Sequence, residues 1–189
     1  TGPVLISAGT LDKKTVGVKF NEPVSSTTGT VAGNYSLSQG TVTAARLGIG
    51  GDSVYLTVSG LTANTFAVTV TNVTDPTGNK IAASSTVNAK ATGLQSVDIG
   101  SIQSPSPRVP TPGDDPYRPG QAVATSSDDA AEIEIIGGGS NAWNPGDYIH
   151  WLYSPTPILG DFDVAAKVSR FDRPNNNAGY GNSGVMLRA

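Results

Sequence analysis

The chain has 189 residues and few charges: Lys, Arg, Asp and Glu make up 14% of it, against about 25% in an average soluble domain. Its net charge is −3 and it contains no run of Lys or Arg, so it lacks the basic cluster typical of a nucleic-acid-binding protein. The absence of Cys excludes thiol catalysis, disulfide bonds and Cys-based zinc sites, and the short apolar runs are not long enough to span a membrane.

The first ninety residues alternate short β-strand patterns with turn signals. Apolar residues recur at every second position in three segments, 16–20, 54–58 and 66–70. This period places one face of each predicted strand inward and the other outward. Clusters of Asn, Asp, Gly and Pro bound the segments and predict turns. About seven short strands at this spacing predict an immunoglobulin-like β-sandwich.

Four blocks within residues 3–90 carry a family resemblance. The sequence reads VGVKFNEPV at 16–24, NYSL at 34–37, VYLTVSGL at 54–61 and VTVTNVTDPTGN at 68–79. In this order and at this spacing, the blocks resemble the bacterial Ig-like domain found in S-layer proteins and in many secreted enzymes. The resemblance implies a spacer or a surface-assembly module, and it brings no catalytic residues.

Prolines concentrate after this block. Residues 93–120 contain six of the 13 prolines of the chain, and such spacing stiffens an extended segment that has no core of its own. We therefore predict a first domain at 1–92, a Pro- and Gly-rich linker at 93–120 and a second domain at 121–189. The segment VDIG at 97–100 leaves a second interpretation open, in which this stretch is a long first loop of the second domain.

The second block also reads as β structure, with strands predicted at 132–136, 148–153, 161–168 and 183–188, and no helical periodicity is found anywhere. The segments VDIG, PGQA, GGGSNAW, GDYIHWLY, GDFDVAAKVSRF and NSGVMLRA resemble the first part of a bacterial jelly-roll family related to concanavalin-like and laminin-G-like domains. Members of that family occur in large secreted bacterial proteins beside carbohydrate-active or adhesive modules. The resemblance therefore implies sugar or polymer recognition by analogy.

Such a jelly roll normally continues well past the GVMLR strand. We therefore expect the second domain to be an N-terminal part only, in an excised or processed piece of a longer protein. A partial sandwich leaves an apolar face and unpaired strand edges to be covered. Either further residues of the same protein or a second chain would cover them.

The candidate ligand-binding residues of the second block are the aromatic residues Trp143, Tyr148 and Tyr180. Exposed aromatic rings serve sugar-binding proteins as flat stacking platforms. Trp143 follows a Gly-rich turn, which suits a rim position as well as a core position, whereas Trp151 is expected in the core. His150 is the single His, and we expect an ordinary strand residue with one hydrogen bond, because catalysis would need a nucleophile and an orienting acid.

Three carboxylates are candidate metal ligands. Asp161 and Asp163 stand two residues apart on a predicted strand and would share a face, and Asp172 begins an Asn-rich loop. Ca²⁺ takes about six to eight oxygen ligands, so these residues could contribute to a calcium site. The alternative is a solvated strand face for the first two and an ordinary turn for Asp172. No other cofactor is predicted.

Together these patterns predict a non-catalytic, all-β, secreted or cell-surface accessory segment of a larger bacterial protein. The first domain would space or assemble, and the second would bind polysaccharide or a neighbouring chain. One alternative is a structural subunit of a surface layer, fibre or filament whose open sheet another chain completes, which implies self-assembly. The other alternative is a non-catalytic fragment of a secreted glycoside hydrolase or lyase. None of these implies nucleic acid as a partner or insertion into a membrane.

Overall fold

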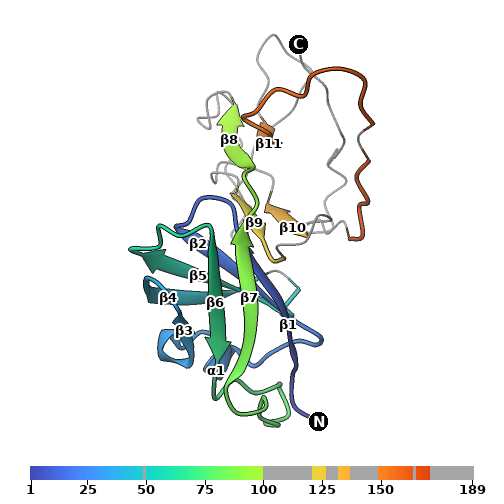
Figure 1. The fold of residues 1–189 in the computed structure, drawn as a ribbon. Coiled ribbons are helices and arrows are strands. Elements are labelled where there is room, and N and C mark those ends of the chain that lie inside the picture. The colour runs from blue at the N-terminus through green and yellow to red at the C-terminus, as the bar shows by residue number, and fades with distance from the viewer. Residues whose placement is uncertain (49, 100–120, 127–131, 137–148, 164, 171–189) are drawn as a thin grey trace, which may run out of the picture.

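A computed structural model of the chain describes residues 1–48, 50–99, 121–126, 132–136, 149–163 and 165–170 (Figure 1). Its regular structure is almost entirely β, which confirms the predicted all-β fold. The strands are β1 (Leu5–Thr10), β2 (Thr15–Phe20), β3 (Tyr35–Leu37), β4 (Thr41–Leu47), β5 (Ser53–Ser59), β6 (Thr65–Val70), β7 (Ser85–Ala91), β8 (Gln95–Ile99), β9 (Gln121–Ala124), β10 (Ile133–Ile136) and β11 (Ile149–Tyr153).

Two single helical turns interrupt the strands. They are α1 (Ser26–Gly29) and a 3₁₀ turn, η1 (Ala32–Asn34), between β2 and β3. The sequence analysis found no helical periodicity, and a single turn is too short to show the repeat by which a helix is identified.

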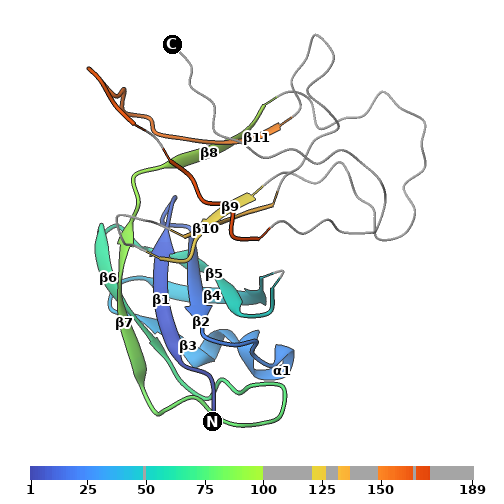
Figure 2. The same ribbon diagram turned by 90° about the vertical axis from the view of Figure 1, so that its right-hand side faces the viewer.

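The first seven strands form one continuous sheet in the order β3-β6-β7-β1-β2-β5-β4. Strand β1 links its two halves, because it pairs antiparallel with β2 and parallel with β7 through Gly9 and Thr10. The halves β3-β6-β7 and β1-β2-β5-β4 enclose the core between them (Figure 2). This grouping is the strand order of a constant-type immunoglobulin sandwich, and the predicted β-sandwich architecture is confirmed.

Alternation along the strands builds the core. In β2, Val16, Val18 and Phe20 are buried on the inner face, while Gly17 and Lys19 point outward. Each fully buried Val or Phe contributes about 1.5–3 kcal/mol. The buried members of the core are Leu5, Ala8, Val16, Val18, Phe20, Val24, Tyr35, Val54, Leu56, Val58, Leu61, Phe66, Val68, Val70, Val73, Ile81 and Ala89. All of them precede residue 92, so the seven-stranded unit encloses its core by itself.

The predicted turn at 75–79 is held by the carboxylate of Asp75. Its Oδ2 accepts a hydrogen bond of 2.7 Å from Nδ2 of Asn79, and its Oδ1 accepts hydrogen bonds from the backbone N–H groups of Thr77 and Asn79 at 2.8 and 2.9 Å. These donors, the Asn79 side chain first, favour the charged form and lower the pKa of Asp75 to about 2.

The remaining strands form two small antiparallel sheets, β9 with β10 and β8 with β11. Strand β8 lies within the residues predicted as a linker and pairs with β11. The strand predicted at 161–168 is wrong for its described residues, which are irregular and exposed, and 183–188 lies outside the described residues. The partial jelly roll and the domain boundaries at 92 and 120 stay predictions.

Candidate functional site

The β9–β10 hairpin packs against the outer face of the seven-stranded unit, at the upper ends of β1 and β2 in Figure 1. All of Ala122, Val123, Ala124, Thr125 and Ser126 are buried. We call the surface under the hairpin the docking face, and it consists of the side chains or backbone of Ser7, Gly9, Gly17, Lys19, Arg46, Ser53 and Tyr55.

Two glycines let β9 approach the sheet closely. A Cβ atom on Gly9 would lie 2.3 Å from the carbonyl oxygen of Ser126, and one on Gly17 would lie 2.4 Å from that of Ala124. Both distances are far below van der Waals contact, and both obstacles are backbone atoms. Glycine is therefore required at both positions, because only it leaves room for the second backbone. Ser7 adds a hydrogen bond of 2.8 Å from its Oγ to the carbonyl of Thr125.

Glu134 of β10 anchors the hairpin to the docking face. Its Oε2 accepts a hydrogen bond of 2.9 Å from Oγ of Ser53 and another from the hydroxyl of Tyr55. Its Oε1 lies 3.7 Å from Nζ of Lys19, and within the described ranges it has no hydrogen-bond donor. The Glu134 side chain is only 21% exposed. Side chains alternate between the two faces of β10, so Glu134 points towards the docking face and its neighbour Ile135 points to the opposite face.

Lys19 is the positive charge at the centre of three carboxylates. Its Nζ lies 3.1 Å from Oδ2 of Asp52 and 3.2 Å from Oε1 of Glu132, in addition to the contact with Glu134. Burial lowers the pKa of Lys19, but the hydrogen bonds and charges of Asp52 and Glu132 outweigh burial, so the net pKa is raised. Lys19 therefore stays protonated at neutral pH and offsets part of the negative charge around it.

Tyr55 lies under the hairpin, with its ring beside Arg46 and its hydroxyl beside Glu134. The guanidinium of Arg46 stands 4.5 Å from the ring centroid, which is cation–π geometry, and Nη2 of Arg46 also donates to Oε1 of Gln121 in β9. Burial raises the pKa of Tyr55, and the hydrogen bond and charge of Glu134 raise it further. The phenol therefore stays neutral and acts as a donor to Glu134.

These groups are arranged to join two β elements. Lys19 is held protonated, which removes its capacity as a nucleophile, and Tyr55 is held as a hydrogen-bond donor. A misplaced partner would leave a partly buried charge unpaired, which costs free energy. The docking face therefore selects one seating of the hairpin.

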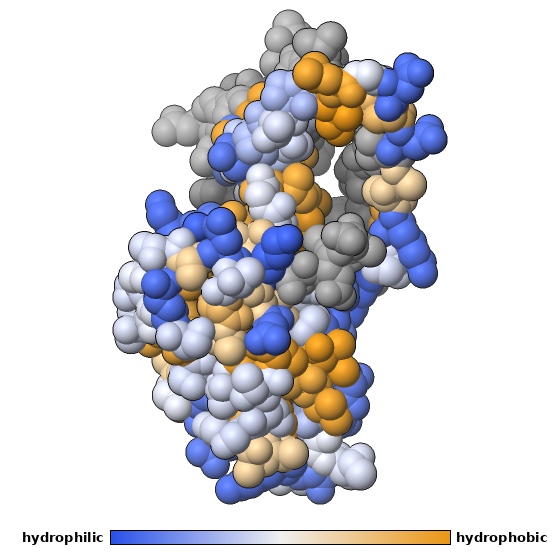
Figure 3. Space-filling view, in the orientation of Figure 1, coloured by the Kyte–Doolittle hydropathy of each residue, from blue (hydrophilic) through white to orange (hydrophobic). Residues whose placement is uncertain are grey.

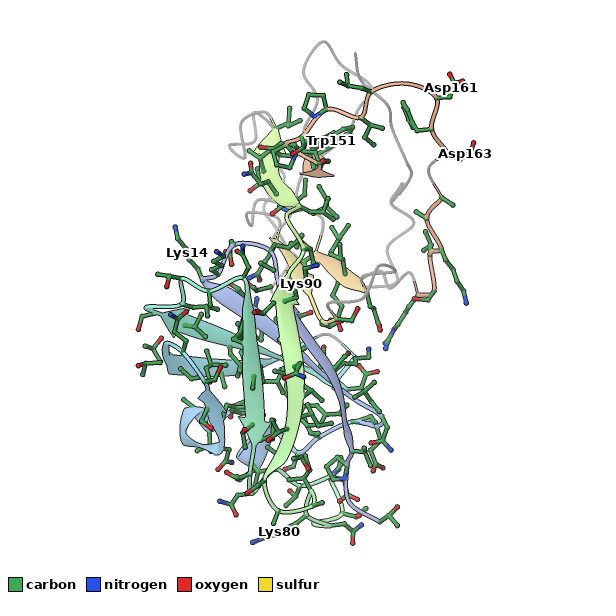
Figure 4. All side chains as sticks on the ribbon, in the orientation of Figure 1. Lys14, Lys80, Lys90, Trp151, Asp161 and Asp163 are labelled. Carbon is green, nitrogen blue, oxygen red and sulfur yellow. The ribbon has the colours of Figure 1, made fainter. Side chains whose placement is uncertain are left out.

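The predicted metal ligands Asp161 and Asp163 are exposed in the irregular segment after β11, away from the docking face (Figure 4). Within the described ranges, no group of three or more His, Asp or Glu side chains is placed to hold a metal ion. Trp143, Tyr148, Tyr180 and Asp172 lie outside the described residues. The calcium site and the sugar-stacking aromatic residues stay predictions.

His150 is a strand residue with a hydrogen bond, as expected. Its Nδ1 lies 2.8 Å from Oδ1 of Asp98, directly across the β11–β8 pair, and its side chain is 4% exposed. Trp151 pairs with Val97 and is half-buried. The expectation of a core position for Trp151 therefore holds only in part, because the sheet of β8 and β11 has two strands and covers the ring incompletely.

The sequence analysis missed the docking face. One signal was available: Gly17 sits in the middle of a strong strand pattern, and an interior strand glycine often marks the close approach of another backbone. The roles of Tyr55 and Glu134 had no local signal, because each is an outward position in its own strand.

Comparison with known proteins gives a limited result. No family model matches the chain, and no curated protein sequence matches it. The chain is similar to three solved structures, the S-layer protein rSbsC(31-844), the N-terminal part of the bacterial S-layer protein SbsC, and domains 1–6 of surface layer protein SbsC, each at 18% identity and a TM-score of 0.46 over 79% of this chain. It spans 22%, 37% and 22% of their lengths, respectively. Likeness at this level assigns neither fold nor function.

In the part of the chain that the structure describes, no helix has the length and apolar character needed to cross a bilayer.

Proposed function

We propose that the chain is a non-catalytic structural segment of a bacterial cell-surface protein, and that it functions by associating with other chains. The observation that carries this proposal is the exposure of large apolar side chains outside the seven-stranded unit. These residues are Val97, Ile135, Ile158, Leu159, Phe162 and Val168.

Single exposed apolar residues are ordinary on any protein surface. Here, however, four of them fall within residues 158–168, where Leu159 is 88% exposed. Hydrophobic side chains are visible at the surface of this upper part of the molecule and also on the seven-stranded unit below it (Figure 3). Larger exposed apolar areas mark sites of protein–protein contact. The chemistry of this surface suits another β protein better than it suits a small polar substrate.

Two polar clusters also support a structural role, because their side chains join β elements to each other. The cluster around Lys19 is used to hold the hairpin on the docking face. The His150–Asp98 pair ties β11 to β8. The resemblance of residues 3–90 to the Ig-like domain of surface-layer proteins points in the same direction.

Association can be tested by light scattering and electron microscopy of the purified chain over a range of concentrations. We expect concentration-dependent growth into regular sheets or fibres, and the double substitution Leu159→Ser with Phe162→Ser should weaken it. The matched control is Val4→Ser, an exposed apolar residue of the seven-stranded unit, which should leave association unchanged. A strict monomer at the highest attainable concentration contradicts the proposal, as does failure of an antibody to reach the protein on intact cells.

A further inference from the structure

We propose that the docking face also accepts the β9–β10 hairpin of a second copy of this chain, so that neighbouring molecules are joined by exchange of the hairpin. This inference rests on the proposed function and deepens it, because it names the partner and the contact. Exchange of an identical element is a low-cost route to association, because the element makes the same contacts with the second molecule as it makes within one molecule.

The docking face is complementary to this hairpin. Gly9 and Gly17 make room for the backbone of β9, and Ser53 and Tyr55 supply two donors to one carboxylate oxygen of Glu134. A different segment would leave those two donors without a matched acceptor, and it would leave Lys19 with Asp52 but without Glu132 and Glu134. A second copy carries the matching hairpin by definition.

The docking face does not depend on its own hairpin for its fold. Every buried member of the core lies between Leu5 and Ala89. The seven strands therefore keep their packing when the hairpin leaves, and the face remains in place as a receptor. The departing hairpin uncovers polar and glycine positions, and rebinding of any copy of the hairpin restores the same contacts.

The sequence that connects the hairpin to β8 is long and rich in Pro. Residues 100–120 join β8 to β9, and six of these 21 residues are Pro. Pro-rich sequences favour an extended chain of about 3.1 Å per residue, which gives a reach of roughly 65 Å for a segment of this length. Strands β8 and β9 are neighbours in this structure, and a connection with this reach is long enough for the hairpin to meet the docking face of an adjacent molecule. Docking on a neighbour uses the same contacts as docking on the same molecule.

The experiment uses the full chain, which contains no Cys. Arg46 and Gln121 touch at the rim of the docking face, so one copy carries Arg46→Cys and a mass tag, and the other carries Gln121→Cys. The two are incubated together at increasing concentration and treated with a short bifunctional maleimide. We expect a cross-linked heterodimer whose yield rises with concentration, and a single chain with both substitutions should give an internal cross-link at low concentration.

Two substitutions in β10 form a matched pair. Both Glu132 and Glu134 contact Lys19, but Glu132 is 48% exposed and only Glu134 accepts from Ser53 and Tyr55. Placed in the Gln121→Cys copy, Glu134→Gln should lower the heterodimer yield on the order of tenfold or more, because removing a buried, hydrogen-bonded charge is costly. Glu132→Gln should change the yield by less than about twofold. The unfolding transition of the seven-stranded unit is measured for both, to verify that they fold.

Two results overturn the inference: an internal cross-link with no heterodimer at any concentration, or a heterodimer yield that Glu134→Gln leaves unchanged. Light scattering of the same samples separates the two proposals. Regular assembly without the heterodimer means that the chains associate through another surface, and the proposed function stands. A heterodimer without regular assembly or surface exposure supports hairpin exchange and contradicts the proposed function.

Discussion

Tyr55 donates its hydroxyl hydrogen to Glu134 across the boundary between the seven-stranded unit and the β9–β10 hairpin. The two residues are 79 positions apart in the chain, and each points away from the core of its own element. In the docked arrangement each side chain provides a hydrogen-bond partner for the other. Without the hairpin, the hydroxyl of Tyr55 would be exposed to water. Without the sheet, the carboxylate of Glu134 would be exposed to water as well. Their contact makes the hairpin a specific attachment of the sheet.

Replacing Tyr55 with Phe should loosen the hairpin. The substitution keeps the ring under Arg46 but leaves Oε2 of Glu134 with Ser53 alone, and a lost hydrogen bond to a buried charged group costs about 1.5–3 kcal/mol. Urea unfolding of the full chain measures this cost. The matched control is Tyr153→Phe, which removes an exposed hydrogen bond to Gln95 and should lower the free energy of unfolding by less than about 0.5 kcal/mol. Equal effects of both substitutions contradict the anchoring role of Glu134.

Gly17→Ala should displace β9 from the docking face. Its Cβ would lie 2.4 Å from the carbonyl oxygen of Ala124, so the hairpin must move or leave. Hydrogen exchange should show earlier exchange of the amides of Val123 and Ala124, with little change in the amides of β6. Gly33→Ala serves as the control, because a Cβ there meets nothing within 4 Å. Unchanged exchange in β9 would show that the close approach is not required.

Stability should fall at alkaline pH. Burial raises the pKa of Tyr35 and of Tyr55, and the pKa of Lys19 is raised above its ordinary 10.5. A group whose folded-state pKa is raised stabilises the fold fully below its unfolded-state pKa, here 10.0 for Tyr, and that stability is lost as the pH rises towards the folded-state value. Unfolding measured from pH 8 to 12 should therefore show a decline that begins near pH 10, and absorbance should show late ionisation of two tyrosines. A decline of the same size in Tyr55→Phe would argue against a contribution from this residue.

The sequence predicted the strands that carry a strong local pattern. Alternation in residues 16–20 and 54–58 reflects burial of one sheet face, which is the physical cause of the pattern, and β2 and β5 form there. Strands β10 and β11 were predicted from apolar residues at the right spacing. The segment 161–168 shows the same kind of pattern, yet its described residues are irregular, because a strand also needs a neighbour to pair with, and a local pattern does not report one.

The docking face could not be derived in the same way. Ser53 and Tyr55 are buried although they face outward from the sandwich, and the hairpin that contacts them comes more than sixty residues later in the chain. Glu134 was placed on a predicted strand, but a charged residue that alternates with Ile reads as solvent-exposed. The burial of both surfaces is decided by a long-range contact, for which neither segment carries a periodic signal.

Asp75 should make the seven-stranded unit sensitive to acid. Its pKa is lowered from 3.8 to about 2 by the hydrogen bonds from Asn79 and Thr77, so its contribution is present above pH 4 and is lost as the pH falls through the folded-state value. Asp75→Asn should lower stability at neutral pH and flatten the dependence between pH 4 and 2, as measured by urea unfolding at each pH. The substitution Asp161→Asn, at an exposed carboxylate, provides the control and should change neither. A pH dependence that persists in Asp75→Asn would assign the acid sensitivity to other groups.

A fragment of residues 1–92 should fold cooperatively without the hairpin, because the buried core residues all precede residue 92. It should be less stable than the full chain, since its docking face is uncovered. In this fragment Gly17→Ala should not destabilise, because the added Cβ meets no hairpin backbone. Alanine also lowers the conformational entropy of the unfolded chain, so the substitution should be neutral or should stabilise the fragment by about 0.4–1 kcal/mol. Circular dichroism and urea unfolding of the fragment and its variant measure both expectations. Destabilisation of the fragment by Gly17→Ala would mean that the glycine serves the sheet itself rather than the hairpin.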